Sequence, residues 1–303
     1  MKKKDFLLLS NYTKDEILSL LALAAELKDK KRRGEPHPLL QGKTLGMVFE
    51  KSSTRTRVSF EVGMYDLGGT ALFLSGRDLQ IGRGEPIEDT ARVLSRYLDG
   101  IMIRTYEQEK VETLARYSTI PVINGLTDYA HPCQVLADLL TIQEHKGSLE
   151  GLTLCYVGDG NNMANSLIVG GIKTGMKVRV ACPISNQPDA AVMDWARSVG
   201  DFKCTPDVFA AAQGADVLYT DVWASMGQED EQEARRKIFA GYQINEAVVN
   251  AAAPGAMVLH CLPAHRGEEI TAEVMEAHAE EIFDEEENRL HAQKAVMVNL
   301  MRD

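Results

Sequence analysis

Thr44-Leu-Gly-Met-Val-Phe49 is a short apolar run that leads directly into the hydroxyl-rich, basic segment Glu50-Lys-Ser-Ser-Thr-Arg-Thr-Arg57. A helical pattern follows, in which Val58, Val62 and Tyr65 are spaced to lie on one face. A buried strand, a polar turn and a helix in this order are typical of the first part of a βαβ unit. The segment therefore predicts a parallel sheet covered by helices.

The same alternation of strand and helix patterns continues along the chain. The apolar, β-branched runs are residues 44–49, 71–74, 100–104, 120–123, 152–157, 178–182, 217–220 and 257–260. The helical patterns lie near residues 54–67, 86–98, 107–117, 133–146, 162–174, 188–199, 229–240 and 285–301. This alternation predicts an α/β fold with two doubly wound parallel-sheet domains linked by helices. Such sheets bind ligands beyond the carboxyl ends of their strands, so we expect an active site in the interdomain cleft.

A length of 303 residues suits two domains of about 150 residues each. Residues 127–146 have the pattern of a loop followed by a connecting helix, and Gly147 stands just beyond it. We therefore expect one domain over residues 1–140 and a second over residues 141–284.

Charge and composition restrict the function classes. The net charge of −11 argues against nucleic-acid binding, because phosphate backbones require clustered Lys and Arg. No stretch approaches the roughly 20 apolar residues of a membrane span. Only four apolar residues stand between the basic N-terminal residues and Ser10, which is too few for a signal peptide. The five cysteines form no CxxC motif, which is typical of reduced thiols in the cytoplasm.

The segment after the first strand predicts an anion site. Ser53, Thr54 and Thr56 supply hydroxyl groups, and Arg55 can donate two hydrogen bonds to one phosphate. A helix start adds backbone N–H groups and the positive end of the helix dipole. A simpler interpretation stays open for this segment taken alone, in which Ser52 or Ser53 caps the helix and the arginines lie in solvent.

Further polar residues follow other predicted strands. Arg104 ends a buried strand, where a charge requires a partner. His131-Pro-Cys-Gln134 begins a helix, and both His131 and Gln134 can donate to a small polar ligand. A single histidine of this kind is more often structural than catalytic, but several such groups at successive strand ends favour a site.

Ser53-Thr-Arg-Thr56 together with His131-Pro-Cys-Gln134 resembles the carbamoyl phosphate signature of the aspartate and ornithine carbamoyltransferases. The residues that this resemblance assigns to the phosphate are Ser53, Thr54, Arg55, Thr56 and Arg104. The carbamoyl oxygen would be polarised by Thr56, Arg104 and His131, and Gln134 would hold the carbamoyl amide. Gln80 matches a loop that reaches the phosphate site of a neighbouring subunit, which implies a homotrimer with shared active sites.

The second half of the chain carries the candidate acceptor site. Gly158-Asp-Gly160 begins like a dinucleotide fingerprint, but Met163 occupies the third glycine position. The amides of Asn161-Asn162 at a helix start suit a carboxylate instead. Asp221 and Ser225 can both accept from an ammonium group, although an isolated Asp in a loop often bonds only its own backbone. Cys261 ends a buried strand, where a lone cysteine is usually inert.

The segments Asn161-Asn162, Asp221-Val-Trp-Ala-Ser-Met-Gly227 and His260-Cys-Leu-Pro263 resemble the ornithine branch of this family. The residues that the resemblance assigns to the ornithine α-amino and α-carboxylate groups are Asn162, Asp221, Ser225 and Met226. Cys261 would lie by the reacting amine and near carbamoyl phosphate, and Leu262 would offer its carbonyl to the carbamoyl nitrogen. Arg289 matches an arginine that reaches carbamoyl phosphate, so the helix 285–303 is expected to pack back on the first domain.

The resemblance implies that residues 1–140 bind carbamoyl phosphate and residues 141–284 bind L-ornithine. The expected reaction is carbamoyl transfer to the ornithine side-chain amine, giving citrulline and phosphate in arginine biosynthesis, without cofactor or metal. The residues expected to be catalytic are Arg55, Arg104, His131, Asp221 and Cys261. Putrescine or an N-acylated ornithine is the alternative acceptor, and a binding protein without catalysis is the non-enzymatic alternative. A zinc site fits poorly, because the H-x-C and H-C spacings around His131 and Cys261 match no common ligand set.

Overall fold

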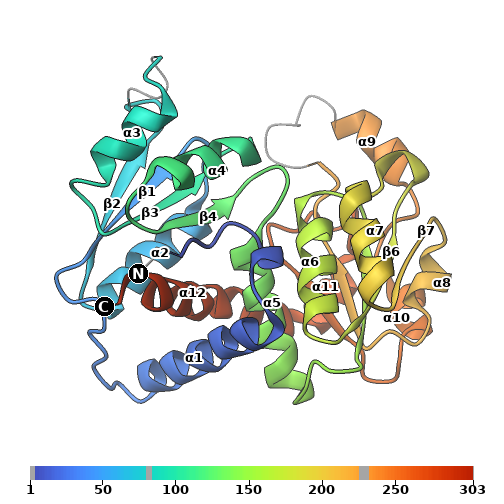
Figure 1. Ribbon diagram of the computed structural model, residues 1–303. Helices are drawn as coiled ribbons and strands as arrows, with labels where there is room; N and C mark the ends of the chain where they lie inside the picture. The colour runs from blue at the N-terminus through green and yellow to red at the C-terminus, as the bar shows by residue number, and fades with distance from the viewer. Residues whose placement is uncertain (1–3, 80–83, 225–231, 303) are drawn as a thin grey trace. The chain divides into compact units, whose positions relative to one another are not determined.

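A computed structural model describes residues 4–79, 84–224 and 232–302 (Figure 1). The chain divides into two compact units. Unit 1 comprises Met1–Ala137 and Asn288–Asp303, and unit 2 comprises Asp138–Glu287. The chain passes between the units inside two helices, α5 (Pro132–Lys146) and α12 (Ala279–Met301).

Unit 1 contains a four-stranded sheet in the order β2-β1-β3-β4, and every neighbouring pair is parallel. The strands are β1 (Thr44–Phe49), β2 (Thr70–Ser75), β3 (Gly100–Arg104) and β4 (Val122–Leu126). The helices are α1 (Lys14–Arg32), α2 (Thr54–Asp66), α3 (Ile87–Leu94) and α4 (Gln108–Tyr117), with the start of α5 and the end of α12. Val48, Ile101 and Ile103 pack with Ala91 of α3 and Leu114 of α4 in one apolar cluster on this sheet.

The C-terminal part of α12 belongs to unit 1, beside α1 and α2 (Figure 1). Lys28 Nζ of α1 donates to Asn288 Oδ1 at 2.8 Å, and both residues are buried. Gly63 of α2 allows close packing, since a Cβ at this position would lie 2.8 Å from Met297 Cε. These contacts hold the part of α12 after Asn288 against α1 and α2.

Unit 2 contains a five-stranded parallel sheet in the order β7-β6-β5-β8-β9. Its strands are β5 (Thr153–Val157), β6 (Lys177–Ala181), β7 (Phe202–Thr205), β8 (Val217–Thr220) and β9 (Met257–His260). Its further helices are α6 (Asn162–Lys173), α7 (Ala190–Val199), α8 (Val208–Ala212), α9 (Gln232–Phe239), α10 (Glu246–Ala251) and α11 (Ala272–Ala277). The strand order in the sheet places β5, β8 and β9 side by side, so the residues that follow these parallel strands lie at one edge of the sheet.

The two parallel sheets confirm the expected α/β fold. Several elements differ from the sequence prediction. The strand β7 and the helices α1, α8, α10 and α11 were not predicted, and α12 begins at Ala279 rather than near 285. The sequence predicts a domain boundary between residues 140 and 141, and the structure divides the chain between Ala137 and Asp138.

Unit 1 exposes apolar side chains along α2 and the edge strand β2. Val58, Val62 and Tyr65 share one face of α2 as their spacing predicts, but Tyr65 is 82% exposed. The helix buries Phe60 and Met64 instead. Beside them, Leu72 and Phe73 of β2 are 44% and 40% exposed. No helix in the described parts of the chain is long and apolar enough to cross a membrane.

Candidate active site

The turn between β1 and α2 has a capped helix start. Ser53 is the N-cap residue, and its Oγ accepts from the Thr56 backbone N–H at 3.2 Å. The same hydroxyl donates to Thr56 Oγ1 at 3.1 Å. Thr54 and Arg55 form the first turn of α2, where backbone N–H groups have no partner within the helix. The capping interpretation is therefore correct for Ser53, and the same turn has the dipole and donors of an anion site.

Thr56 is the centre of a buried polar group in unit 1. Arg104 Nη1, from the end of β3, donates to Thr56 Oγ1 at 3.4 Å. Arg289 Nη2, from α12, donates to the same hydroxyl at 3.4 Å, and Arg289 Nη1 donates to Gln134 Oε1 of α5. Thr56, Arg104, Gln134 and Arg289 are all buried. The structure thus brings together residues from α2, β3, α5 and α12 that are far apart in the sequence.

His131 lies directly before α5, among these guanidinium groups. Burial lowers the pKa of His131 well below its usual value, and the positive charges of Arg289, Arg104 and Arg55 lower it further. The imidazole is therefore neutral near pH 7, and one ring nitrogen carries a hydrogen that can be donated. A concentration of positive charge beside a neutral donor suits a ligand with an anionic group next to a carbonyl oxygen.

Arg289 is itself held by Gln293, which is not among the predicted site residues. Gln293 lies one helical turn further along α12. In the amide orientation that its neighbours favour, the Gln293 oxygen accepts from Arg289 Nη2 at 3.0 Å and Nε at 3.2 Å. Its amide nitrogen then donates to Ser59 Oγ of α2 at 2.6 Å. The spacing of four residues from Arg289 was the available signal, because such pairs share a helix face.

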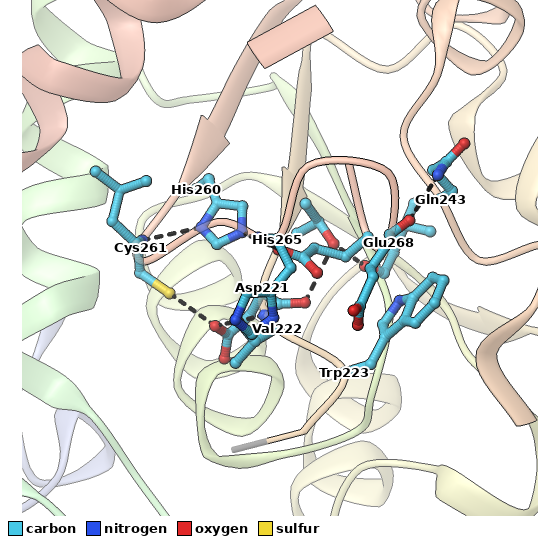
Figure 2. A network of polar contacts seen from close by, with 12 residues as sticks. Asp221, Val222, Trp223, Gln243, His260, Cys261, His265 and Glu268 are labelled. Atoms are coloured by element: carbon cyan, nitrogen blue, oxygen red, sulfur yellow. Dashed lines mark hydrogen bonds and ion pairs between the residues drawn. The ribbon is translucent and has the colours of Figure 1, made fainter. Parts of the chain in front are cut away.

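Asp221, directly after β8, is the centre of the polar group in unit 2 (Figure 2). Its Oδ2 accepts from Asn161 Nδ2 at 2.9 Å. Its Oδ1 accepts from the Val222 backbone N–H at 2.8 Å and from Cys261 Sγ at 3.1 Å. The bond to Val222 is the local turn contact expected of an Asp in a loop, but the other two join Asp221 to β9 and to the start of α6.

Cys261 follows β9 and carries a protonated thiol. Burial raises the pKa of Cys261 well above the usual cysteine value, and the carboxyl groups of Asp221, Glu285 and Asp138 raise it further. The hydrogen bond to Asp221 acts in the same direction, because the thiol donates and a thiolate could not. Cys261 is therefore a weak hydrogen-bond donor beside a carboxylate rather than a nucleophilic thiolate.

Asn161 and Asn162 have different positions at the start of α6. Asn161 is the N-cap residue, and its Oδ1 accepts from the backbone N–H groups of Met163 and Ala164. Its amide nitrogen is committed to Asp221. Asn161 therefore orients Asp221 and does not offer a carboxylate site as the sequence predicted for the pair. Asn162 is the first residue of the helix.

The Gly158-Asp-Gly160 segment has a structural role. Asp159 is paired with Arg235 of α9, and Asn186 Nδ2 donates to Asp159 Oδ1 at 3.2 Å. A Cβ on Gly160 would lie 2.2 Å from the backbone of Gln187 and Pro188. Gly160 is therefore required for close packing of two loops.

Three predicted site residues, Gln80, Ser225 and Met226, lie outside the described residues. Of the other predicted residues, the structure links Ser53, Thr56, Arg104, Gln134 and Arg289 by hydrogen bonds in unit 1. In unit 2 it links Asp221 with Cys261, and the Leu262 backbone N–H donates to the His260 ring.

His265, Glu268 and Glu269 are close enough for a metal ion, with potential ligand atoms within 4.8 Å of one another. Glu268 Oε1, however, accepts from Arg236 Nε at 2.9 Å, and the guanidinium charge opposes a cation there. Glu269 Oε1 accepts from the His265 backbone N–H at 2.6 Å and lies 3.0 Å from His260 Nε2. These contacts account for the cluster as part of the protein fold, and we assign no metal to it.

Comparisons with known proteins agree with this division into two groups of residues. Residues 4–144 match the family model "Aspartate/ornithine carbamoyltransferase, carbamoyl-P binding domain", and residues 150–300 match "Aspartate/ornithine carbamoyltransferase, Asp/Orn binding domain". An ornithine carbamoyltransferase of Syntrophotalea carbinolica is 60% identical over 300 residues, covering 99% of each chain.

Solved structures give the same result. The ornithine carbamoyltransferase of Pyrococcus furiosus matches with a TM-score of 0.94 and 54% identity, covering 99% of this chain and 97% of that one. An anabolic ornithine carbamoyltransferase of Campylobacter jejuni matches with a TM-score of 0.92 and 43% identity over 98% of both chains. Two matching family models that together span nearly all of the sequence, and close relatives of equal length, lead to one conclusion: the chain belongs to the aspartate/ornithine carbamoyltransferase family.

Proposed function

We propose that the protein transfers the carbamoyl group of carbamoyl phosphate to the side-chain amine of L-ornithine, giving L-citrulline and phosphate. The observation that carries the proposal is the buried group in which Arg104 and Arg289 donate to Thr56 and Arg289 donates to Gln134. The charges of both arginines act on the nearby His131, which is neutral. The relatives named ornithine carbamoyltransferase support ornithine as the acceptor.

Carbamoyl phosphate would bind in unit 1. Its phosphate would lie at the N-terminus of α2, with Ser53, Thr54 and Thr56 donating through hydroxyl or backbone groups and Arg55 donating through its guanidinium. The carbamoyl oxygen would accept from His131, Arg104 and the Thr56 hydroxyl, while Gln134 would contact the carbamoyl amide. Arg289 supports this arrangement by fixing both Thr56 and Gln134.

Ornithine would bind in unit 2. A carboxylate has about four acceptor positions, so Asp221 can accept from the α-ammonium group in addition to its protein donors. Asn162, at the start of α6, would bind the α-carboxylate, aided by the helix dipole. Ser225 and Met226 would complete this contact. The Cys261 thiol and the Leu262 carbonyl would lie near the reacting amine and the carbamoyl group.

The chemistry requires the neutral amine as nucleophile. The ornithine side chain resembles lysine, whose reference pKa is about 10.4, so the substrate arrives mostly protonated. A dry environment beside the Cys261 thiol would favour loss of that proton. The amine nitrogen then bonds to the carbamoyl carbon, and the resulting oxyanion is stabilised by Thr56, Arg104 and His131. The carbon–oxygen bond to phosphate breaks, and phosphate can carry away the remaining proton.

We further propose a homotrimer in which the loop containing Gln80 completes the site of a neighbouring copy. The exposed apolar residues of α2 and β2 support this assignment, because an extended apolar surface is typical of an interface. We also propose a biosynthetic role in the cytoplasm. The anabolic enzyme of Campylobacter jejuni and the five free cysteines of this chain are consistent with that role.

The test is citrulline formation from carbamoyl phosphate with L-ornithine, in parallel with putrescine, N-acetyl-L-ornithine and L-aspartate. We expect strong preference for L-ornithine, because Asp221 and Asn162 together require a free α-ammonium and a free α-carboxylate. Turnover with another acceptor alone would retain the carbamoyl phosphate site and reject the assignment of unit 2. Absence of turnover with all four acceptors would reject the enzymatic proposal.

A further inference from the structure

The side chain of His260 lies at the end of β9 and is completely buried. Its ring bridges two parts of the following turn. Nδ1 lies 2.9 Å from the Leu262 backbone nitrogen, and Nε2 lies 3.0 Å from Glu269 Oε1. The backbone N–H of His260 donates to Glu285 Oε2 of α12 at 2.9 Å. Figure 2 shows the ring of His260 between Cys261 and the segment that carries His265.

These partners determine the tautomer of His260. A backbone N–H can only donate, so Nδ1 must accept from Leu262 and carries no hydrogen. The ring hydrogen is therefore on Nε2, which donates to Glu269. Glu269 Oε1 also accepts from the His265 backbone N–H at 2.6 Å. The imidazole and one carboxylate oxygen thus connect the backbone at residue 262 with the backbone at residue 265.

Leu262 has a backbone conformation that needs such support. Its φ angle is 50°, and it is the one non-glycine residue with positive φ in the described parts of the chain. Leucine rarely adopts this left-handed region, and residues held there persist only where the surrounding structure fixes them. The bond from the Leu262 N–H to His260 Nδ1 is a direct constraint on this peptide.

We propose that His260 and Glu269 form a positioning pair, which sets the orientation of the Leu262 peptide and the Cys261 side chain for the transfer reaction. The inference rests on the proposed function, in which these two residues contact the substrates. Cys261 is fixed from one side by Asp221 and from the other by the backbone that His260 holds. His260 acts through these neighbours and takes no part in proton transfer to substrate.

Two substitutions separate the roles of the two ring nitrogens. His260→Asn places an amide oxygen close to the position of Nδ1, where it can accept from Leu262, but it cannot reach Glu269. His260→Gln can place an amide nitrogen near the position of Nε2 and donate to Glu269, but it offers Leu262 no acceptor. Each variant loses one buried hydrogen bond of the ring, so we expect similar decreases in Tm.

Steady-state kinetics on the purified full-length variants give the decisive comparison. We expect His260→Asn to retain most of kcat, and His260→Gln to lower kcat by about 100-fold, the order of loss caused by misplaced reacting groups. His145→Gln is the matched control. It removes a histidine–carboxylate pair in the same unit, His145 with Asp284, and this pair supports no turn that contacts a substrate in the proposed function. This control should leave kcat unchanged.

Equal kcat for the two His260 variants, or a more active Gln variant, would overturn the positioning role. If neither variant folds, imidazole ¹⁵N spectra of the unmodified protein provide the test. The histidine signal that responds to Glu269→Gln must show hydrogen on Nε2, and hydrogen on Nδ1 or on both nitrogens would overturn the proposal. An unmodified protein that forms no citrulline would reject the proposed function instead, whatever its tautomer.

Discussion

The hydroxyl of Thr56 shows how much the site depends on single side chains. It accepts from guanidinium groups of two elements, β3 and α12, and it lies beside the cap of a third, α2. The sequence identified Ser53, Thr54, Arg55 and Thr56 as a group because they are consecutive. It did not identify Gln293, although the spacing of four residues from Arg289 is a signal for such a contact. The role of Asn161 could not be predicted, because its contact with Asp221 is set by packing between segments distant in the sequence.

Arg55 provides the first prediction. Arg55→Ala should lower kcat/KM for carbamoyl phosphate at least about 100-fold, since a charge-assisted contact to the phosphate and to the transition state is lost. The thermal midpoint should change little, because Arg55 is only partly buried. Arg33→Ala, which removes an exposed arginine paired with Asp29, is the control for charge. Near-normal kinetics in the Arg55 variant would remove this residue from the site.

The Cys261 thiol provides the second. Because its pKa is raised, Cys261 should react slowly with iodoacetamide at pH 8. Asp221→Asn removes a negative charge and should lower that pKa, so alkylation of Cys261 should become faster at the same pH. Peptide mass spectrometry measures both rates. A rate that is unchanged or slower in the Asn variant would contradict the thiol–carboxylate contact.

At the scale of elements, α12 carries both a residue of the candidate site and residues that pack within unit 1. Arg289 reaches the candidate site. Further along the same helix, Lys294 is buried, and its Nζ donates to His37 Nε2 at 2.7 Å and to Asp66 Oδ2 at 3.3 Å. The helix is 23 residues long, and the sequence prediction recognised only its part from residue 285. No glycine or proline marks a start at 285, so the pattern alone could not locate the true N-terminus.

His291 on α12 gives an acid-dependence of stability. Burial, and then the charges of Lys294, Lys28, Lys31 and Arg32, lower its pKa to about 3. The unfolded chain binds a proton near pH 6.5 and the folded chain does not, so stability falls as the pH decreases from about 6.5 towards 3. At pH 5 this loss is about 2 kcal/mol. His291→Gln should remove it, as urea unfolding at pH 7 and pH 5 can measure; an equal loss in both proteins would contradict the buried neutral histidine.

Element prediction succeeded where composition and period agree, as in β1, β3, β8 and β9. Their bounds match the apolar runs because buried parallel strands read as continuous hydrophobic segments. The helix α1 was missed although Thr13 and Glu16 form a capping box at its start. The short strand β7 has a mixed burial pattern at the edge of its sheet, so its four residues carry little signal.

At the scale of the whole molecule, the sequence correctly predicted an apolar face on α2. It could not show whether that face is buried within the chain. Val58, Val62 and Tyr65 have the spacing of a core-facing stripe, yet they are exposed in the single chain. An amphipathic pattern indicates that a helix face is covered, but it does not show whether the same chain or a second copy of it covers that face. The proposed trimer resolves this difference.

The apolar surface therefore predicts an effect on assembly. Tyr65→Glu should shift the protein from trimer to smaller species in light scattering, because a buried charge without a partner opposes association. Phe209→Glu changes an exposed apolar residue of α8 in unit 2 and should leave the mass unchanged. A Tyr65 variant that remains trimeric would place the interface elsewhere on the molecule.

The central claim is that a carbamoyl group moves from phosphate to the ornithine side-chain nitrogen. The most direct test is to supply carbamoyl phosphate labelled with ¹³C and to follow the carbon and phosphorus signals by NMR in the presence of the enzyme and L-ornithine. We predict that the label appears in the ureido carbon of citrulline, with one phosphate released for each citrulline formed. Phosphate release at a rate that does not depend on ornithine, with no label in citrulline, would contradict the account.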